Sequence, residues 1–189
     1  FTAGGFAPCV NTVMLRTLTL CTLLTLLTGC FPAHAGHGNY SVNDMIEWIE
    51  AHSDYVYHGD PLPQIQVLDK TTVCGDVYPD KAAHEDCNIA GYYDHETNTI
   101  AITETPTDYM VEDHYREVVL LHELVHFLQY YDGRYEVVEC KQALERDAFD
   151  LQDEWIDQQG IDPEQKNDPL FVVFATMCTP MLEHIGNTH

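Results

Sequence analysis

Two histidines and a glutamate stand in the pentapeptide His122-Glu123-Leu124-Val125-His126, the part of the sequence best suited to chemistry. Residues four positions apart on a helix lie one turn from each other, so both imidazoles can reach one metal ion. Glu123 stands beside the first imidazole, where its carboxylate can take a proton from metal-bound water. The pentapeptide therefore predicts a catalytic Zn²⁺ site with His122 and His126 as ligands and Glu123 as the general base.

The residues around the pentapeptide are apolar from Val118 to Leu128, which predicts a buried helix. Burying two imidazoles and a carboxylate costs free energy unless partners satisfy them, and a metal ion is such a partner. The alternative is a pair of core histidines hydrogen-bonded to their neighbours. Glu123 would then need a buried partner of its own, so we favour the metal site.

A catalytic zinc ion needs a third protein ligand and keeps a fourth position for water. We expect this ligand to be Glu145, 19 residues after His126, because a turn at Asp132-Gly133 can return the chain as an antiparallel helix. The apolar stripe of that helix places Glu145 at its edge, next to the small Ala148. Other carboxylates stay open as the third ligand, namely Glu139, Asp147 and Asp150.

The segment from Val119 to Leu128 resembles the zincin metallopeptidases, because it matches their extended signature around the pentapeptide. The later helix is similar to that of the gluzincins, in which a downstream glutamate is the third ligand. The size is similar to that of the minigluzincins and of compact bacterial zincin-like families of unknown function. The resemblance implies zinc binding by His122, His126 and Glu145, and activation of water by Glu123.

The sequence departs from these families at several positions. The larger gluzincins have an aspartate four residues after the ligand glutamate, but Phe149 stands there, so Asp147 or Asp150 must support the histidine or the contact is absent. The metzincin pattern fails, because Gln129 replaces its glycine and Asp132 its third histidine. No position identifies the group that would stabilise an oxyanion, and the candidates are Tyr130, Tyr131, Tyr135, His114 and His184.

Residues 1–35 are typical of an export signal. With Met14 as the start, Arg16 supplies the positive charge, and residues 1–13 would be upstream sequence. The apolar segment Leu18–Leu27 is shorter than the roughly 20 residues that span a bilayer. The sequence therefore predicts an exported bacterial protein with one domain at residues 36–189.

Two cleavage patterns compete at the end of this leader. Leu27-Thr28-Gly29-Cys30 resembles a bacterial lipobox, in which Cys30 would carry a lipid anchor, and we favour it slightly. Ala33-His34-Ala35 fits the small-residue pattern of an ordinary signal peptidase site. The first pattern predicts a cell-envelope lipoprotein, and the second a periplasmic or secreted protein.

Hydrophobic periodicity and turn residues predict an α+β domain after the leader. The expected elements are a helix from 42 to about 52, a strand at 64–68, a loop carrying Cys74 and Cys87, a β-hairpin of strands 89–93 and 99–103, and helices at about 108–131, 136–159 and 169–184. The order is zincin-like: an N-terminal helix, a small mixed sheet, the active-site helix, the returning glutamate helix and a C-terminal helix. By resemblance, Thr99–Thr103 would be an edge strand that pairs with an extended peptide.

The residues after the leader keep all 31 acidic side chains and lose only Arg16, so their formal net charge is −24, against −23 for the whole chain. Such a surface repels nucleic acid and anionic lipid, which leaves a lipid anchor as the only predicted membrane contact. Four cysteines remain, an even number that predicts two disulfides in an exported protein. Of the three pairings we favour Cys74–Cys87 with Cys140–Cys178.

The sequence supports two functional hypotheses. The first is an exported, monomeric zinc-dependent hydrolase of peptide bonds that acts on peptides or proteins. The second is a non-catalytic envelope lipoprotein whose zinc site is structural and which serves as a binding or structural module. The two differ in whether the metal keeps a position open to water.

Overall fold

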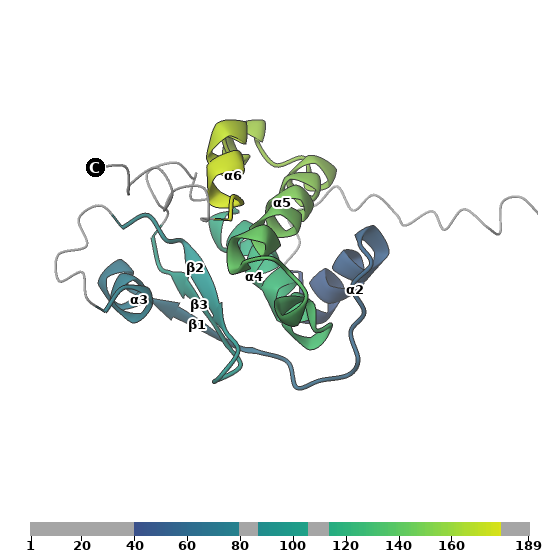
Figure 1. The fold of residues 1–189 in the computed structure, drawn as a ribbon. Helices are drawn as coiled ribbons and strands as arrows, with labels where there is room; N and C mark the ends of the chain where they lie inside the picture. Colours follow the sequence, from purple (N-terminus) through teal and green to yellow (C-terminus); the bar gives the residue numbers. More distant parts are fainter. Residues whose placement is uncertain (1–39, 80–86, 106–113, 179–189) are drawn as a thin grey trace, which may run out of the picture. The chain divides into compact units, whose positions relative to one another are not determined.

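The computed structural model describes residues 40–79, 87–105 and 114–178 (Figure 1). The predicted leader lies outside these residues. Within the described residues there are five α-helices, three short 3₁₀-helices and one sheet of three strands, which confirms the α+β class. In chain order the elements are α2 (Val42–His52), β1 (Gln64–Leu68), α3 (Lys70–Val77), β2 (Gly91–Asp94), β3 (Thr99–Thr103), α4 (Tyr115–Tyr131), η1 (Arg134–Glu136), η2 (Lys141–Leu144), α5 (Glu145–Gln159), η3 (Pro163–Gln165) and α6 (Pro169–Ala175).

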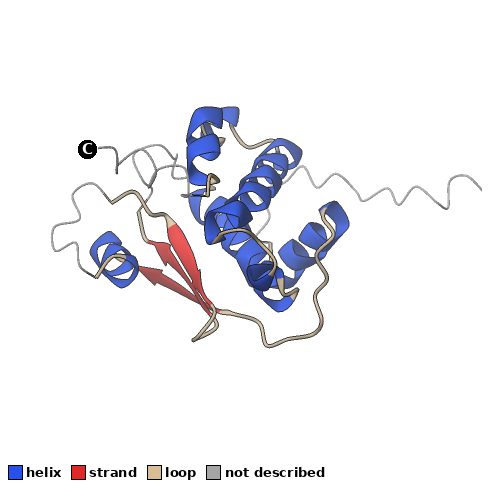
Figure 2. Ribbon diagram, in the orientation of Figure 1, coloured by secondary structure: helices blue, strands red, loops and turns tan. Residues whose placement is uncertain are grey.

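The sheet is mixed, with strand order β1-β3-β2 (Figure 2). Strand β3 pairs in parallel with β1 and antiparallel with β2, through the predicted hairpin. The expectation that Thr99–Thr103 is an edge strand is therefore wrong, because β3 is central and the edges are β1 and β2. The physical reason is that β1, from earlier in the chain, pairs in parallel with the side of β3 that the hairpin leaves open.

Helix α4 forms the centre of the domain, with contacts to β2 and β3 on one side and to α2 and α5 on the other. Twelve of its 17 residues are buried, because a helix packed on several sides needs an apolar surface nearly all round. It begins at Tyr115, and the part of the predicted helix at 108–113 lies outside the described residues. The core around it contains Ile49, Ile100, Leu121, Phe127 and Trp155.

Gly91 allows α4 to approach the sheet closely. A Cβ atom at this position would lie 2.7 Å from Cγ1 of Val119 and 2.8 Å from the backbone oxygen of Ala101. Any side chain larger than hydrogen would therefore push α4 away from β2 or break the pairing of β2 with β3. The same Cβ would lie 3.4 Å from Cγ of Glu123, so this contact also sets the distance between β2 and the pentapeptide.

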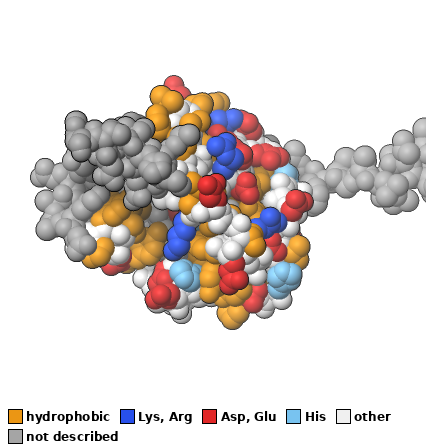
Figure 3. All heavy atoms as spheres, viewed as in Figure 1, with side chains coloured by type: hydrophobic (Ala, Val, Ile, Leu, Met, Phe, Trp, Pro, Cys, Tyr) orange, Lys and Arg blue, Asp and Glu red, His pale blue; other side chains and the backbone are white. Residues whose placement is uncertain are grey.

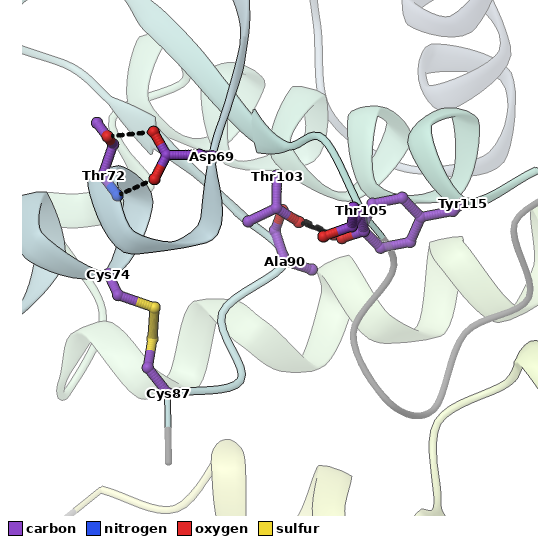
Figure 4. The surroundings of a disulfide bond; sticks show 8 residues. All are labelled: Asp69, Thr72, Cys74, Cys87, Ala90, Thr103, Thr105 and Tyr115. Carbon is purple, nitrogen blue, oxygen red and sulfur yellow. Dashed lines mark hydrogen bonds between the residues drawn. A yellow bond between two sulfur atoms is a disulfide. The ribbon is translucent and has the colours of Figure 1, made fainter. Parts of the chain in front are cut away.

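The predicted loop after β1 contains a helix, α3, which the sequence analysis missed. Asp69 caps it by accepting a hydrogen bond from the Thr72 backbone N–H (Figure 4). Its low amphipathicity hid the helical period, since only Val73 and Cys74 are buried. The disulfide Cys74–Cys87 is formed as predicted and ties α3 to the segment before β2.

The helix predicted at 136–159 begins only at Glu145, after the short helices η1 and η2. Gly133 has a positive φ of 71°, and the β-branched pair Val137 and Val138 follows, so the chain turns before α5 starts. The disulfide Cys140–Cys178 has the predicted pairing. It joins the N-cap of η2 to a residue beyond α6 rather than two long helices, and the predicted helical part at 179–184 lies outside the described residues.

Acidic side chains are scattered over the face seen in Figure 3, with fewer Lys and Arg between them. Helix α6 exposes apolar side chains, including Leu170, Phe171 and Phe174. No described helix is both long enough and apolar enough to cross a bilayer.

Candidate metal centre

Three side chains from two neighbouring helices converge on one point. The Nε2 atoms of His122 and His126 lie 3.2 Å apart, and Oε2 of Glu145 lies 3.2 Å from the first and 3.4 Å from the second. Within 40–79, 87–105 and 114–178, no second group of three potential metal ligands converges in this way. The structure thus brings together the three ligands that the sequence predicted.

These separations fit a tetrahedral zinc ion. With bond lengths of about 2.0–2.1 Å, the ligand atoms of a tetrahedral site lie about 3.3 Å from one another. The three measured distances of 3.2–3.4 Å agree with this value on every edge of the triangle. Two imidazole nitrogens and one carboxylate oxygen are also the donor set of catalytic zinc sites, which leave the fourth position for water.

Local structure explains the convergence. His122 and His126 are one turn apart on α4 and are 7% and 8% exposed, while Glu123 between them is 5% exposed. Glu145 is the first residue of α5, and the fully buried Ala148 one turn later lets α5 pack closely against α4. The Glu145 side chain keeps 33% of its surface exposed, so the centre opens to solvent on the side of α5.

The other carboxylates named as possible third ligands are directed elsewhere. Glu139 is exposed, before η2. Asp147 accepts a hydrogen bond from the Tyr55 hydroxyl at 2.6 Å. Asp150 lines a cavity of about 280 Å³ together with Tyr55, Arg134 and Asp147.

The charges at the centre shift the pKa values of its groups in opposite directions. Burial alone would raise the pKa of the Glu145 carboxyl, but hydrogen bonds from His122 and His126 outweigh burial and hold this pKa well below its usual range. Burial raises the pKa of Glu123, against the opposing effect of the two imidazoles. A carboxyl group with a raised pKa is suited to accept and return a proton near neutral pH.

The two imidazoles have different partners on their far side. Nδ1 of His126 lies 2.8 Å from Oε1 of Gln129, a residue that the sequence analysis did not assign to the site. The sequence feature that could have revealed Gln129 is a polar residue in an otherwise apolar helix, three positions after the predicted ligand His126. Nδ1 of His122 is buried with no hydrogen-bond partner among the described residues, and the ring of Phe149 packs against this imidazole. Neither Asp147 nor Asp150 replaces the absent gluzincin aspartate at His122.

Five residues were candidates to stabilise an oxyanion. Among those that the structure describes, Tyr135 is the one whose hydroxyl pKa is changed by the carboxylates of the centre. Burial raises the pKa of Tyr135 to about 12, and the charges of Glu123 and Glu145 add to this effect. Tyr130 and Tyr131 pack against other aromatic rings, and Nδ1 of His114 lies 3.4 Å from Oε2 of Glu117. His184 lies outside the described residues.

The sequence profile of a family described as "Domain of unknown function (DUF6647)" matches residues 34–185. The chain belongs to this family. The DUF6647 domain includes all three converging ligands and both disulfides. No curated protein and no solved structure matches the chain.

Proposed function

We propose that this DUF6647 domain is a zinc-dependent hydrolase of peptide bonds, of the gluzincin type within a zincin-like fold. The observation that carries the proposal is the triangle of Nε2, Nε2 and Oε2 atoms at 3.2–3.4 Å, next to a buried carboxylate. His122, His126 and Glu145 would hold the zinc ion. Zinc, when bound, polarises the substrate carbonyl and lowers the pKa of water to about 7.

The protein's own groups move the protons. The Glu123 carboxylate accepts a proton from the attacking water and delivers it to the leaving amine nitrogen. Its raised pKa, caused by burial, favours the first of these transfers, from water to the carboxylate. Tyr135, whose hydroxyl pKa is raised by burial and by the charges of Glu123 and Glu145, is the candidate donor to the oxygen on which charge develops.

In this proposal the substrate main chain lies along the edge strand β2, because β2 packs against α4 beside Glu123. The Ala90 carbonyl accepts a hydrogen bond from the Thr103 backbone N–H, so the alternation of an antiparallel pair directs the backbone groups of Gly91 and Tyr93 away from β3. The Tyr93 backbone N–H donates a hydrogen bond to the Glu123 carboxylate, so the groups of Gly91 and the Tyr93 carbonyl are the ones proposed to pair with an extended peptide. The edge strand in this role is therefore β2 instead of β3.

The two disulfides fit an exported protein, since such bonds persist in oxidising compartments. We therefore assign the activity to the cell envelope or the space outside it. A lipid anchor on Cys30 rests on the lipobox pattern alone, beside the alternative of cleavage after Ala35.

One observation favours the alternative of a non-catalytic zinc protein. Nδ1 of His122 has no acceptor in the described residues, whereas ligating histidines in metal enzymes usually donate their second N–H. In this alternative the same three ligands hold a structural ion in an envelope binding module.

The test combines metal analysis with hydrolysis by the full chain, with both disulfides oxidised. We expect one zinc per chain and cleavage of casein or a peptide library that a chelator stops and zinc restores. Glu123→Gln should abolish cleavage and keep the zinc, while the exposed control Glu136→Gln should keep both. Zinc binding without any cleavage would favour the non-catalytic alternative, and a chain that binds no zinc would refute both.

A further inference from the structure

We propose that Gln129 is a positioning residue, which fixes the orientation of His126 and the start of α5 through one hydrogen-bond chain. The inference rests on the proposed zinc site, because it concerns how two of the ligands are held before and during metal binding. It assigns a role to a glutamine and a tyrosine that the motif does not contain.

The chain of hydrogen bonds starts at the ligand and ends at two acceptors. Oε1 of Gln129 lies 2.8 Å from Nδ1 of His126. The Gln129 amide nitrogen donates to the Leu144 carbonyl at 2.9 Å and to the Tyr55 hydroxyl oxygen at 3.0 Å. The Tyr55 hydroxyl in turn donates to Oδ2 of Asp147 at 2.6 Å. Gln129 is completely buried, so these contacts replace all of its hydration.

The chemistry of the end groups fixes the direction of every bond in this chain. A backbone carbonyl and a carboxylate can only accept, so the amide nitrogen must face Leu144 and the Tyr55 proton must point to Asp147. The amide oxygen of Gln129 then faces His126, whose Nδ1 must carry a proton. With Nδ1 held as the donor to Gln129, Nε2 is the nitrogen that gives up its proton and presents its lone pair when a metal ion binds at the point where Glu145 and His122 converge.

The same amide also sets the position of the third ligand. Leu144 directly precedes Glu145, and Asp147 follows it by two residues, so both ends of the chain flank the ligating glutamate. One buried side chain on α4 thus holds the imidazole of His126 and the first turn of α5 in fixed register. Tyr55, which lies outside both helices, extends this connection to the segment after α2.

The experiment measures zinc affinity by chelator competition, and the thermal stability of the metal-free protein, in the oxidised full chain. Gln129→Met keeps the size and removes both the acceptor and the donor, so we expect 10- to 100-fold weaker zinc binding, a loss on the order of that seen when such partners are removed. Tyr55→Phe keeps the Gln129–His126 contact and should lose less. The control is Gln152→Met, the same change at another buried glutamine, which should leave the affinity unchanged.

A second variant separates positioning from general stability. Gln129→Glu keeps an acceptor beside His126 but cannot donate to Leu144, so it should lower the melting temperature and still bind zinc at least about tenfold more tightly than Gln129→Met. In the zinc-loaded wild type, the His126 Nδ1 proton should exchange slowly enough to be seen by NMR, and it should be lost in Gln129→Met.

The outcomes distinguish this inference from the proposed function. Wild-type affinity in Gln129→Met, or losses in the Met and Glu variants that simply follow their melting temperatures, would overturn the positioning role while the zinc site stands. A wild-type chain that binds no zinc would overturn the proposed function together with this inference.

Discussion

The ring of Phe149 packs against the imidazole of His122, with 4.8 Å between the ring centroids. Phe149 lies on α5, one turn after the proposed ligand Glu145. A hydrophobic ring thus lies next to a histidine whose Nδ1 has no acceptor in the described part of the chain. The two proposed histidine ligands are therefore unequal, since Nδ1 has a hydrogen-bond partner in the described residues only in His126.

The first prediction follows from this inequality. Phe149→Asn places an acceptor within reach of His122 and should tighten zinc binding by up to about tenfold, because a partner on the second nitrogen orients the ring and raises its basicity. Chelator competition measures the change. Phe149→Leu is the control, since it removes the ring without adding an acceptor. Equal tightening in both variants would mean that the ring's bulk, and not the missing acceptor, limits affinity.

The second prediction concerns the third ligand. In wild type, zinc at about 1,000 times its dissociation constant should stabilise the fold by about 4 kcal/mol, which calorimetry detects as a higher melting temperature. Glu145→Gln removes one charged ligand and should abolish most of this shift. Glu139→Gln changes an exposed carboxylate of the same segment and should keep the shift. A loss in Glu139→Gln with retention in Glu145→Gln would transfer the ligand role to Glu139.

The third prediction tests the close approach of α4 and β2. Gly91→Ala should lower the free energy of unfolding by about 1–3 kcal/mol, because the added methyl group meets the Ala101 backbone oxygen, which cannot rotate away. Gly75→Ala in α3 is the matched control: its Cβ meets no atom within 4 Å, so denaturant unfolding should show unchanged or slightly higher stability. An unchanged stability of Gly91→Ala would show that α4 and β2 can move apart without loss of unfolding free energy.

The fourth prediction concerns pH in the metal-free protein. The interactions with Glu145 raise the pKa of His126 to about 9 although burial opposes this, and the Glu145 pKa is lowered against its own burial by the two histidines. A raised histidine pKa stabilises the fold below the unfolded value of 6.5, and a lowered carboxyl pKa stabilises it above 4.5. Stability should therefore be highest between these pH values and fall as the pH rises towards 9.

Melting curves of the chelated protein across this range test the fourth prediction. His126→Asn lacks the titrating ring, so its stability should decline less between pH 6.5 and 9. An identical alkaline decline in the variant and the wild type would assign the effect to another group.

The sequence predicted the elements whose boundaries are set by residues close to them in the chain. Ser41 and Asp44 form the reciprocal cap at the start of α2, and strand β1 has the predicted bounds. The convergence of His122, His126 and Glu145 was predicted because helical spacing and one antiparallel return are sufficient to bring these side chains together. The cap, the strand and the convergence of the three side chains each depend on residues within a few helical turns or on one short connection between two helices.

The features that were missed depend on contacts between distant segments. The central place of β3 follows from parallel pairing with β1, 35 positions earlier, for which no turn signal exists. The partner of Gln129 is Tyr55, 74 positions away, and no periodicity connects the two. Helix α3 was missed for a different reason, since it buries only two residues and is fixed by its cap and a disulfide.

The disulfide Cys140–Cys178 links a residue five positions before Glu145 to a residue after the end of α6. The bond closes a loop of 38 residues. In the loop-entropy description, it lowers the conformational entropy of the unfolded chain and so stabilises the fold by about 4 kcal/mol. A newly made polypeptide with free thiols would lack this restraint next to Glu145. Oxidation of the two thiols would therefore stabilise the segment that carries the proposed third ligand.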